Sequence, residues 1–169
     1  MQSQQPALIV HQGEGEAVWL GGLGVNFKVA GNMTGGTFSI VEHPVDAGRL
    51  VPPHTHTRED ELSYVIEGEM GARIGDEIVV ACAGDYVFKP RNVPHAFWNA
   101  GPAPLRIIEI IWPPDFEAFF RELAELYAAG GGSPDPEKAA DLAGRYGNVF
   151  HFDWVPELTS RYGLKLLGD

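Results

Sequence analysis

Cysteine is almost absent from this chain of 169 residues, which has a single thiol at Cys82. One cysteine cannot form an internal disulfide, so the sequence excludes a small scaffold held together by disulfide bonds. Cys82 ends an apolar run over residues 78–82 that is typical of a strand. We expect it to be a buried and inert thiol rather than a nucleophile.

Basic residues are scarce, because 12 Lys and Arg stand against 23 Asp and Glu and give a net charge of −11. Nucleic acids and anionic membranes are bound through basic patches, so we expect neither as a partner. Long apolar runs are missing too, and the first residues, Met-Gln-Ser-Gln-Gln-Pro, lack the basic and apolar parts of a signal peptide. These absences predict a cytoplasmic protein.

In the first two thirds of the chain, short apolar runs alternate with breaks that are rich in glycine. Such breaks are typical of turns. The pattern predicts strands over residues 7–11, 17–20, 25–30, 37–43, 62–66, 78–82 and 105–112. Many short strands joined by close turns favour an antiparallel sandwich or barrel. A chain of 169 residues is long enough to bury the core of one such domain.

Beyond the last of these strands the period of the pattern changes. Apolar residues recur at helical spacing at Phe116, Phe119, Phe120, Leu123, Leu126 and Tyr127. We expect this stripe to pack on the barrel wall, with a substrate lid as the alternative. Asp135 can cap a second helix that has Pro136 in its first turn and ends by Gly147. The predicted organisation is a β-barrel over residues 1–112 and a C-terminal helical extension over 113–169 packed on it.

The densest group of metal-binding side chains lies within residues 48–68. His54 and His56 are two residues apart, so an extended chain presents both imidazoles on one face. Glu61 lies at the start of the following strand, on the inward side with Ser63. Two imidazoles and one carboxylate suit a first-row divalent metal ion and leave coordination positions open. The alternative for this stretch alone is a surface pair of histidines beside a solvated acidic run.

A second stretch, over residues 84–99, reads as a turn, a strand, another turn and a strand that begins at His95. Together the two stretches resemble the two motifs of the cupin family. The first has Gly, five residues, His-x-His, a short gap, Glu, six residues and Gly; the second has Gly, five residues, Pro-x-Gly, two residues, His, three residues and Asn. The chain departs only at Asn92, which replaces a Gly. Asn tolerates the positive φ of a tight turn better than most residues do.

The resemblance implies an all-β fold, the cupin double-stranded β-helix or jelly-roll barrel, here followed by a helical extension. It also implies one divalent transition metal ion per chain, whether Fe, Mn, Ni, Co or Zn. The implied ligands are His54, His56, Glu61 and His95. The remaining histidines, His11, His43 and His151, lie outside both motifs, and we expect them to be surface residues or hydrogen-bonded polar residues.

After the barrel the chain has Pro-Pro, a Phe-rich helix, a Pro-Asp-Pro helix start and a late Arg-Tyr-Gly, and in this it resembles bacterial single-domain cupins of the quercetin dioxygenase-like type. This resemblance implies a metal-dependent dioxygenase that cleaves an enolic or aromatic, flavonol-like substrate with O2, with Glu61 as both ligand and general base. Strand parity suggests a substrate pocket lined by Phe38, Met70, Phe97 and Trp112.

Two alternatives from other classes remain open. One is a cupin that binds a metal or a small molecule without turnover, and the other is a lyase or isomerase acting on a small carboxylate or sugar. The basic residues near the motifs, Arg49, Arg73, Lys89 and Arg91, are scattered, although any of them could face inward. A mostly apolar pocket would favour the dioxygenase, and a basic pocket the lyase. Exposed sheet edges also predict a homodimer, with strands within residues 7–20 as the contact.

Overall fold

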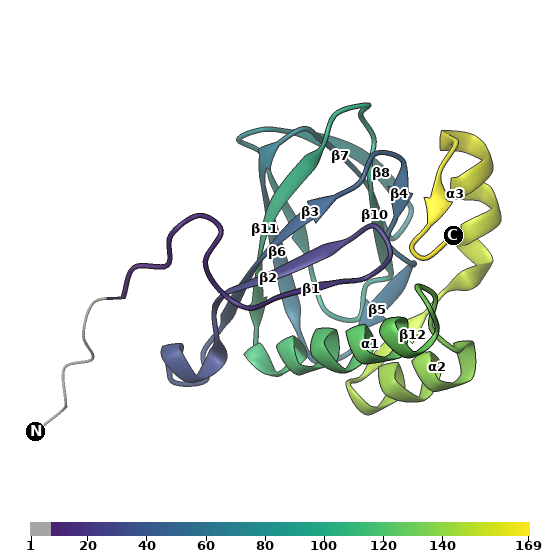
Figure 1. Ribbon diagram of the computed structural model, residues 1–169. Coiled ribbons are helices and arrows are strands. Elements are labelled where there is room, and N and C mark those ends of the chain that lie inside the picture. Colours follow the sequence, from purple (N-terminus) through teal and green to yellow (C-terminus); the bar gives the residue numbers. More distant parts are fainter. Residues whose placement is uncertain (1–7) are drawn as a thin grey trace, which may run out of the picture.

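Two β-sheets face each other and enclose the interior of the protein in the computed structural model, which describes residues 8–169 (Figure 1). In this range the first sheet contains, in spatial order, β1 (Ala17–Trp19), β2 (Gly24–Val29), β3 (Ser39–Val45), β11 (Leu105–Trp112), β6 (Asp60–Glu67) and β9 (Tyr86–Lys89). The second contains β12 (Asn148–Phe150), β5 (His54–His56), β10 (His95–Asn99), β4 (Arg49–Leu50) and β13 (Lys165–Leu166), with β7 (Glu69–Ile74) paired to β10 and β8 (Glu77–Cys82) paired to β7.

Alternation along the central strands decides which side chains enter the barrel. In β11 every second residue is buried, beginning with Leu105, and in β6 the buried positions are Glu61, Ser63 and Val65. Because successive strand residues point to opposite faces, the same rule that places Val65 in the core also carries polar side chains inward. Glu61, Ser63 and Glu109 therefore project into an interior that is otherwise apolar.

The second motif makes the turn that its sequence predicts. Asn92 has a φ of 63° and is the only residue other than Gly with a positive φ among residues 8–169. Its backbone N–H donates to the carbonyl oxygen of His56 at 2.7 Å. The left-handed conformation expected at this position is thus confirmed, and it links the turn before His95 to the strand that carries His56.

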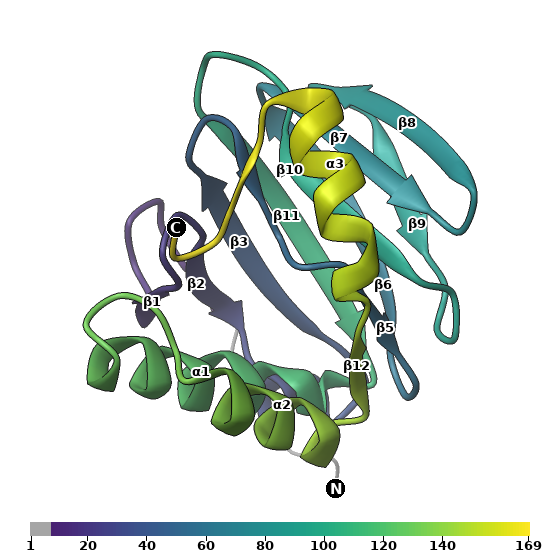
Figure 2. The same ribbon diagram turned by 90° about the vertical axis from the view of Figure 1, so that its right-hand side faces the viewer.

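Helices close one end of the barrel (Figure 2). After η2 (Pro114–Phe116), α1 (Glu117–Ala129) and α2 (Pro136–Arg145) lie side by side across that end. Asp135 caps α2 as predicted, since its Oδ1 accepts hydrogen bonds from the backbone N–H groups of Glu137 and Lys138 at 2.9 and 3.3 Å. The aromatic stripe of η2 and α1 is buried against the barrel. A third helix, α3 (Val155–Tyr162), follows η3 (Phe152–Trp154), and η1 (Gly31–Thr34) lies between β2 and β3.

The last part of the chain also contributes strands, which the sequence did not predict. β12 pairs antiparallel with β5, placing Asn148 opposite His56, and β13 pairs parallel with β4. Between these strands, α3 packs through Leu158 on the outer surface of the second sheet, against Leu50, Ala96 and Trp98. The extension is therefore docked on the barrel, and part of it belongs to the second sheet.

Two local predictions fail. Residues 8–11 form no strand, while Ala7 lies outside the described residues; Leu8 and Ile9 are exposed and have no neighbouring strand to pair with. Cys82 is exposed rather than buried. It lies on β8, which pairs only with β7, and Ala81 is the one fully buried position of that strand, so Cys82 takes the outward parity.

The first sheet ends in an edge strand within the region of the predicted dimer contact. β1 pairs only with β2, and Trp19 on this edge strand is 51% exposed. The homodimer itself stays a prediction. Among residues 8–169, no helix is both long and apolar enough to cross a membrane.

Candidate metal centre

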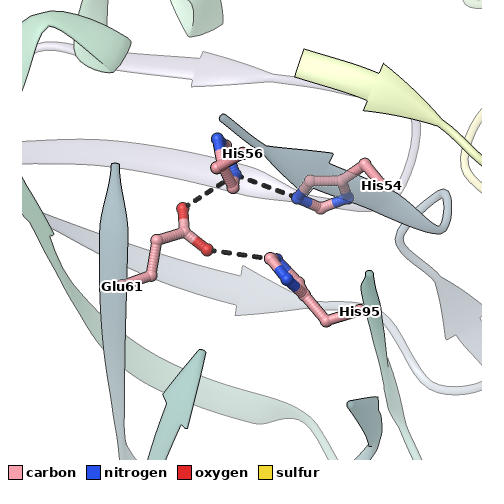
Figure 3. A group of neighbouring side chains, drawn as sticks. All are labelled: His54, His56, Glu61 and His95. Carbon is pink, nitrogen blue, oxygen red and sulfur yellow. Dashed lines mark hydrogen bonds and ion pairs between the residues drawn. The ribbon is translucent and has the colours of Figure 1, made fainter. Parts of the chain in front are cut away.

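Four polar side chains from both sheets converge inside the barrel (Figure 3). β5 supplies His54 and His56, β10 supplies His95 from the position opposite His54, and β6 supplies Glu61 from the facing sheet. One candidate ligand atom from each residue lies within 4.8 Å of the others, and all four side chains are buried. The Nε2 atoms of His54 and His56 are 3.1 Å apart, and those of His56 and His95 lie 3.2 and 3.4 Å from the carboxylate oxygens of Glu61.

The opposite nitrogen of each imidazole faces an acceptor. His54 Nδ1 lies 2.6 Å from the carbonyl oxygen of Pro52, and His95 Nδ1 lies 3.1 Å from that of Val93. The corresponding neighbour of His56 Nδ1 is a buried carboxylate, Glu59, at 3.4 Å. These acceptors place the ring proton on Nδ1 of His54 and His95, which leaves the Nε2 lone pairs directed at the centre of the cluster.

This arrangement fits a divalent metal ion. Two imidazole Nε2 atoms at 3.1 Å cannot both present bare lone pairs to each other, so a proton or a cation must lie between them. His95 Nε2 is buried and has no hydrogen-bond partner in the part of the chain that the structure describes. Three imidazoles and one carboxylate form a donor set suited to Fe, Mn, Co, Ni or Zn. The cluster can therefore bind a metal ion.

Electrostatics inside the cluster show where a proton sits without a metal. Burial, followed by the nearby charges of His95 and His56, lowers the pKa of His54 well below its ordinary value, and burial also lowers the pKa of His95. Burial acts in the same direction on His56, but Glu61 and Glu59 outweigh it and raise the pKa of His56 to about 9. Metal binding must therefore displace a proton from His56 at neutral pH.

Comparison with known proteins agrees with this geometry. The profile of the cupin domain matches residues 42–111, a range that contains both motifs and all four converging side chains. The fold is that of a cupin. The predicted jelly-roll barrel with a C-terminal helical part is thereby confirmed.

Solved structures share this fold over about two thirds of the chain. KdgF from Halomonas sp. is 22% identical, with 65% of this chain and 94% of that chain covered and a TM-score of 0.55. A predicted oxalate decarboxylase from Thermotoga maritima is 20% identical, with 62% and 97% covered and a TM-score of 0.57. An RmlC-like cupin from Shewanella frigidimarina is 26% identical, with 66% and 95% covered and a TM-score of 0.53.

A curated relative is an uncharacterised protein of Methanocaldococcus jannaschii, 30% identical over 76 residues. The match covers 45% of this chain and spans 61% of the relative's length. These likenesses support the cupin fold, and they leave the reaction to be argued from the site itself.

A cavity of about 390 Å³ adjoins the cluster. Its polar lining includes His54, His56, Glu61 and Glu109. The other wall is aromatic and aliphatic and comes mainly from the C-terminal extension and the segment between β1 and β2, through Leu20, Leu23, Phe116, Phe119, Phe120, Leu123, Tyr127, Phe150 and Phe152. Within the described part of the chain, no Lys or Arg side chain lines it.

Glu61 also belongs to a buried network with Lys89, Glu109 and Ser63, which the sequence did not predict. Lys89 Nζ lies 3.0 Å from Glu61 Oε2 and 2.7 Å from Glu109 Oε1, and Ser63 Oγ donates to the same Glu109 oxygen at 2.9 Å. Burial lowers the pKa of Lys89, but Glu109 and Glu61 outweigh this effect and raise it. Burial likewise raises the pKa of Glu61, while the charges of His56 and Lys89 hold it well below its ordinary range. Lys89 and Glu61 are therefore both charged.

The sequence contains a signal for part of this network. In residues 86–89, inward Val87 and outward Phe88 alternate, so Lys89 has the parity of an inward residue. Glu109 is likewise a charged residue at an inward position of the apolar run 105–112. Glu59 belongs to the acidic run before Glu61, and no sequence feature separates it from its exposed neighbours.

The predicted pocket residues are only partly brought together. Phe97 lines the cavity, whereas Phe38, Met70 and Trp112 do not. Met70 is fully buried in the core, Trp112 has the outward parity of β11 and stacks on Phe88, and Phe38 precedes the first buried residue of β3. Parity was therefore read correctly for Phe97 and incorrectly for Trp112.

The other histidines do not join the cluster in the described range. His11 is exposed. His43 is buried, and its Nδ1 lies 2.8 Å from the carbonyl oxygen of Gly24. His151 Nε2 lies 2.7 Å from Thr55 Oγ1. Each is a surface or hydrogen-bonded polar residue, as predicted.

Proposed function

We propose that this cupin is a metal-dependent dioxygenase that cleaves an enolisable aromatic substrate, such as a flavonol, with O2. The observation that carries the proposal is the cavity, which joins a four-residue metal centre to a wall of aromatic side chains. A volume of about 390 Å³ lies within the usual range for small-molecule sites. The apolar character of the opposite wall favours a flat, largely apolar guest.

His54, His56, Glu61 and His95 would hold the metal ion. When bound, a divalent transition ion would acidify an enolic hydroxyl of the substrate and make electron transfer to dioxygen possible. In the overall reaction the substrate is oxidised, dioxygen is reduced, and both of its oxygen atoms enter the products as a carbon–carbon bond breaks. This balance requires no further reductant.

Glu61 is the group that we assign to the substrate proton. It is an anion at the edge of the cavity, held by Lys89 on one side and facing the imidazoles on the other. A carboxylate there can accept the enolic proton, which turns the hydroxyl into the more reactive anion. Asp60, one residue earlier, points away from the site and pairs with Arg91 at 2.6 Å.

The aromatic wall would bind and orient the ring. Phe116 packs edge-on against the imidazole of His56, with ring centroids 4.2 Å apart, and is flanked by Phe119 and Phe120. This wall begins at the metal centre, so a ring lying against it would have its hydroxyl near Glu61. The same surface excludes water from the reacting atoms.

The lining argues against small carboxylates and acidic sugars as substrates. Recognition of such anions generally uses Arg or Lys side chains. The described lining contains none, and the nearby buried cation, Lys89, is already engaged by Glu61 and Glu109. For this reason we place a lyase or isomerase of small anions behind the dioxygenase.

The test combines metal analysis with oxygen uptake. Purified protein is stripped, loaded separately with Fe2+, Mn2+, Co2+ or Ni2+, and given a flavonol or a 1,3-dicarbonyl compound in a closed oxygen electrode. We expect one metal ion per chain and oxygen consumption that matches substrate loss. Binding of these compounds without oxygen consumption under any metal would contradict the proposal and favour a binding protein.

A further inference from the structure

We infer that Lys89 is a positioning residue that fixes the carboxylate of Glu61, so that one oxygen is reserved for the metal ion. The inference rests on the proposed metal centre, but it does not depend on the reaction that the centre catalyses. Lys89 is 1% exposed, and its ammonium group lies between two carboxylates rather than in solvent.

The geometry divides the two oxygens of Glu61 between different partners. Oε2 accepts a charged hydrogen bond from Lys89 Nζ at 3.0 Å and also lies 3.4 Å from His95 Nε2, whereas Oε1 faces His56 Nε2 at 3.2 Å. An oxygen that already accepts a charged hydrogen bond is a weaker electron donor toward a metal. Both oxygens face an imidazole, but Lys89 engages Oε2 and not Oε1, so Oε1 is the stronger donor and a bidentate carboxylate is disfavoured.

Strand register holds Lys89 in this position. β9 pairs with β6 so that Lys89 is directly opposite Glu61, and β11 pairs on the other side of β6 so that Glu109 is opposite Ser63. The three adjacent strands thus project Lys89, Glu61 and Glu109 onto one inward surface. Glu109 and the ring of Phe97, whose centroid is 5.0 Å from Lys89 Nζ, complete the enclosure.

Stability alone gives little reason for this arrangement. Withdrawing charges from water is costly, and a buried ion pair is often no more stabilising than apolar side chains of similar size. Here, however, Lys89 and Glu109 neutralise each other, and the charge of Glu61 remains to offset a divalent cation. The metal centre gives a reason for this arrangement, because the network leaves Glu61 with its negative charge and fixes the orientation of its carboxylate.

The experiment removes Lys89 and Glu109 together, so that the net charge of the buried cluster does not change. In the double variant K89M/E109Q, Met replaces the Lys stem and Gln keeps a hydrogen-bond acceptor for Ser63. The protein is loaded with Co2+, whose visible absorption depends on coordination number and geometry. Its affinity is measured by competition with a chelator. The matched control is R91M, which removes a cation that pairs with Asp60 outside the cluster.

We expect K89M/E109Q to stay folded and to bind Co2+ with an altered spectrum and an affinity lowered by about 10- to 100-fold, the usual cost of losing support for a ligand. R91M should match the wild type in both. A folded double variant with the wild-type spectrum and affinity would overturn the inference. If it fails to fold, K89M and E109Q are tested singly with the same two readouts. Wild-type protein that binds Co2+ but consumes no oxygen would contradict the dioxygenase alone, and wild-type protein that binds no metal would overturn both.

Discussion

The two walls of the cavity are built on different principles. The polar wall comes from strands of both sheets, and its charged groups are held by partners at defined distances, such as Lys89 between Glu61 and Glu109. The aromatic wall comes largely from η2 and α1, and its members contact one another through ring faces and edges. On the proposed function, the polar wall would supply the chemistry, whereas the aromatic wall would limit the size and shape of what enters.

The largest effect should follow from breaking the polar wall at a ligand. H56A and H95A each remove one of the four candidate metal ligands. Loss of a residue that only supports a ligand lowers metal affinity by about 10- to 100-fold, and each of these variants should lower it further. Metal content after gel filtration provides the measurement. H151A serves as the control, because His151 bonds to Thr55 outside the cluster. Full occupancy in both H56A and H95A would show that the ligand assignment is wrong.

A change of one atom type in the polar wall should separate binding from turnover. E61Q keeps the size of the side chain and one oxygen donor but removes its basicity. It should retain much of the metal while slowing turnover by about 10²-fold or more, the usual contribution of a general base. D60N, on the outward side of the same strand, should have little effect. If E61Q holds metal and turns over at the wild-type rate, Glu61 is a ligand only.

Changes in the aromatic wall should act on the substrate and spare the metal. F119L keeps an apolar side chain and should cost less than about 1.5 kcal/mol of unfolding free energy. It removes ring contacts of about 0.5–1.5 kcal/mol, so KM for an aromatic substrate should rise by up to about 10-fold while metal content stays unchanged. F88L is the control, since Phe88 stacks on Trp112 outside the cavity. An equal rise of KM in F88L would contradict the proposed wall.

The smallest effect concerns His43, which lines the cavity together with Phe120. The two rings are T-shaped, with centroids 5.5 Å apart. Burial is the main cause that lowers the pKa of His43 below its unfolded value of 6.5. Its contribution to stability is therefore present above pH 6.5 and lost as pH falls through the lower folded pKa. H43N can still donate to Gly24 but does not titrate. The acid-side decline in unfolding free energy, from urea titrations between pH 7 and 5, should be shallower in H43N, and an identical decline would exclude this role.

The sequence predicts the polar wall better than it predicts the aromatic wall. His54, His56, Glu61 and His95 are recognisable because strand parity and motif spacing fix both their direction and their distance along the chain, and the positive φ of Asn92 follows from its place in the turn. The aromatic stripe of residues 116–127 was recognised as a buried face. That it would also line the cavity depends on how α1 docks, which no local pattern encodes.

The failures have related causes. Lys89 and Glu109 have inward parity, but composition favours solvent for charged residues, and only the pairing of β11, β6 and β9 shows that they neutralise each other. Cys82 has an apolar sequence context, yet it shares the outward face of β8 with the exposed Ile78 and Val80. The strands β12 and β13 are too short to be distinguished from loops without their partners.

The pairing of β12 with β5 has a consequence for the order in which the protein is made. Only His54 of β5 is paired with β10, whereas His54, Thr55 and His56 are all paired with β12, a strand that begins at Asn148. A chain emerging from the ribosome therefore presents all four metal-binding side chains well before the segment that holds two of them in place has been synthesised. Until that segment is made, His54 and His56 lack the strand that pairs with the whole of β5, so an ion bound at that stage would be held less firmly.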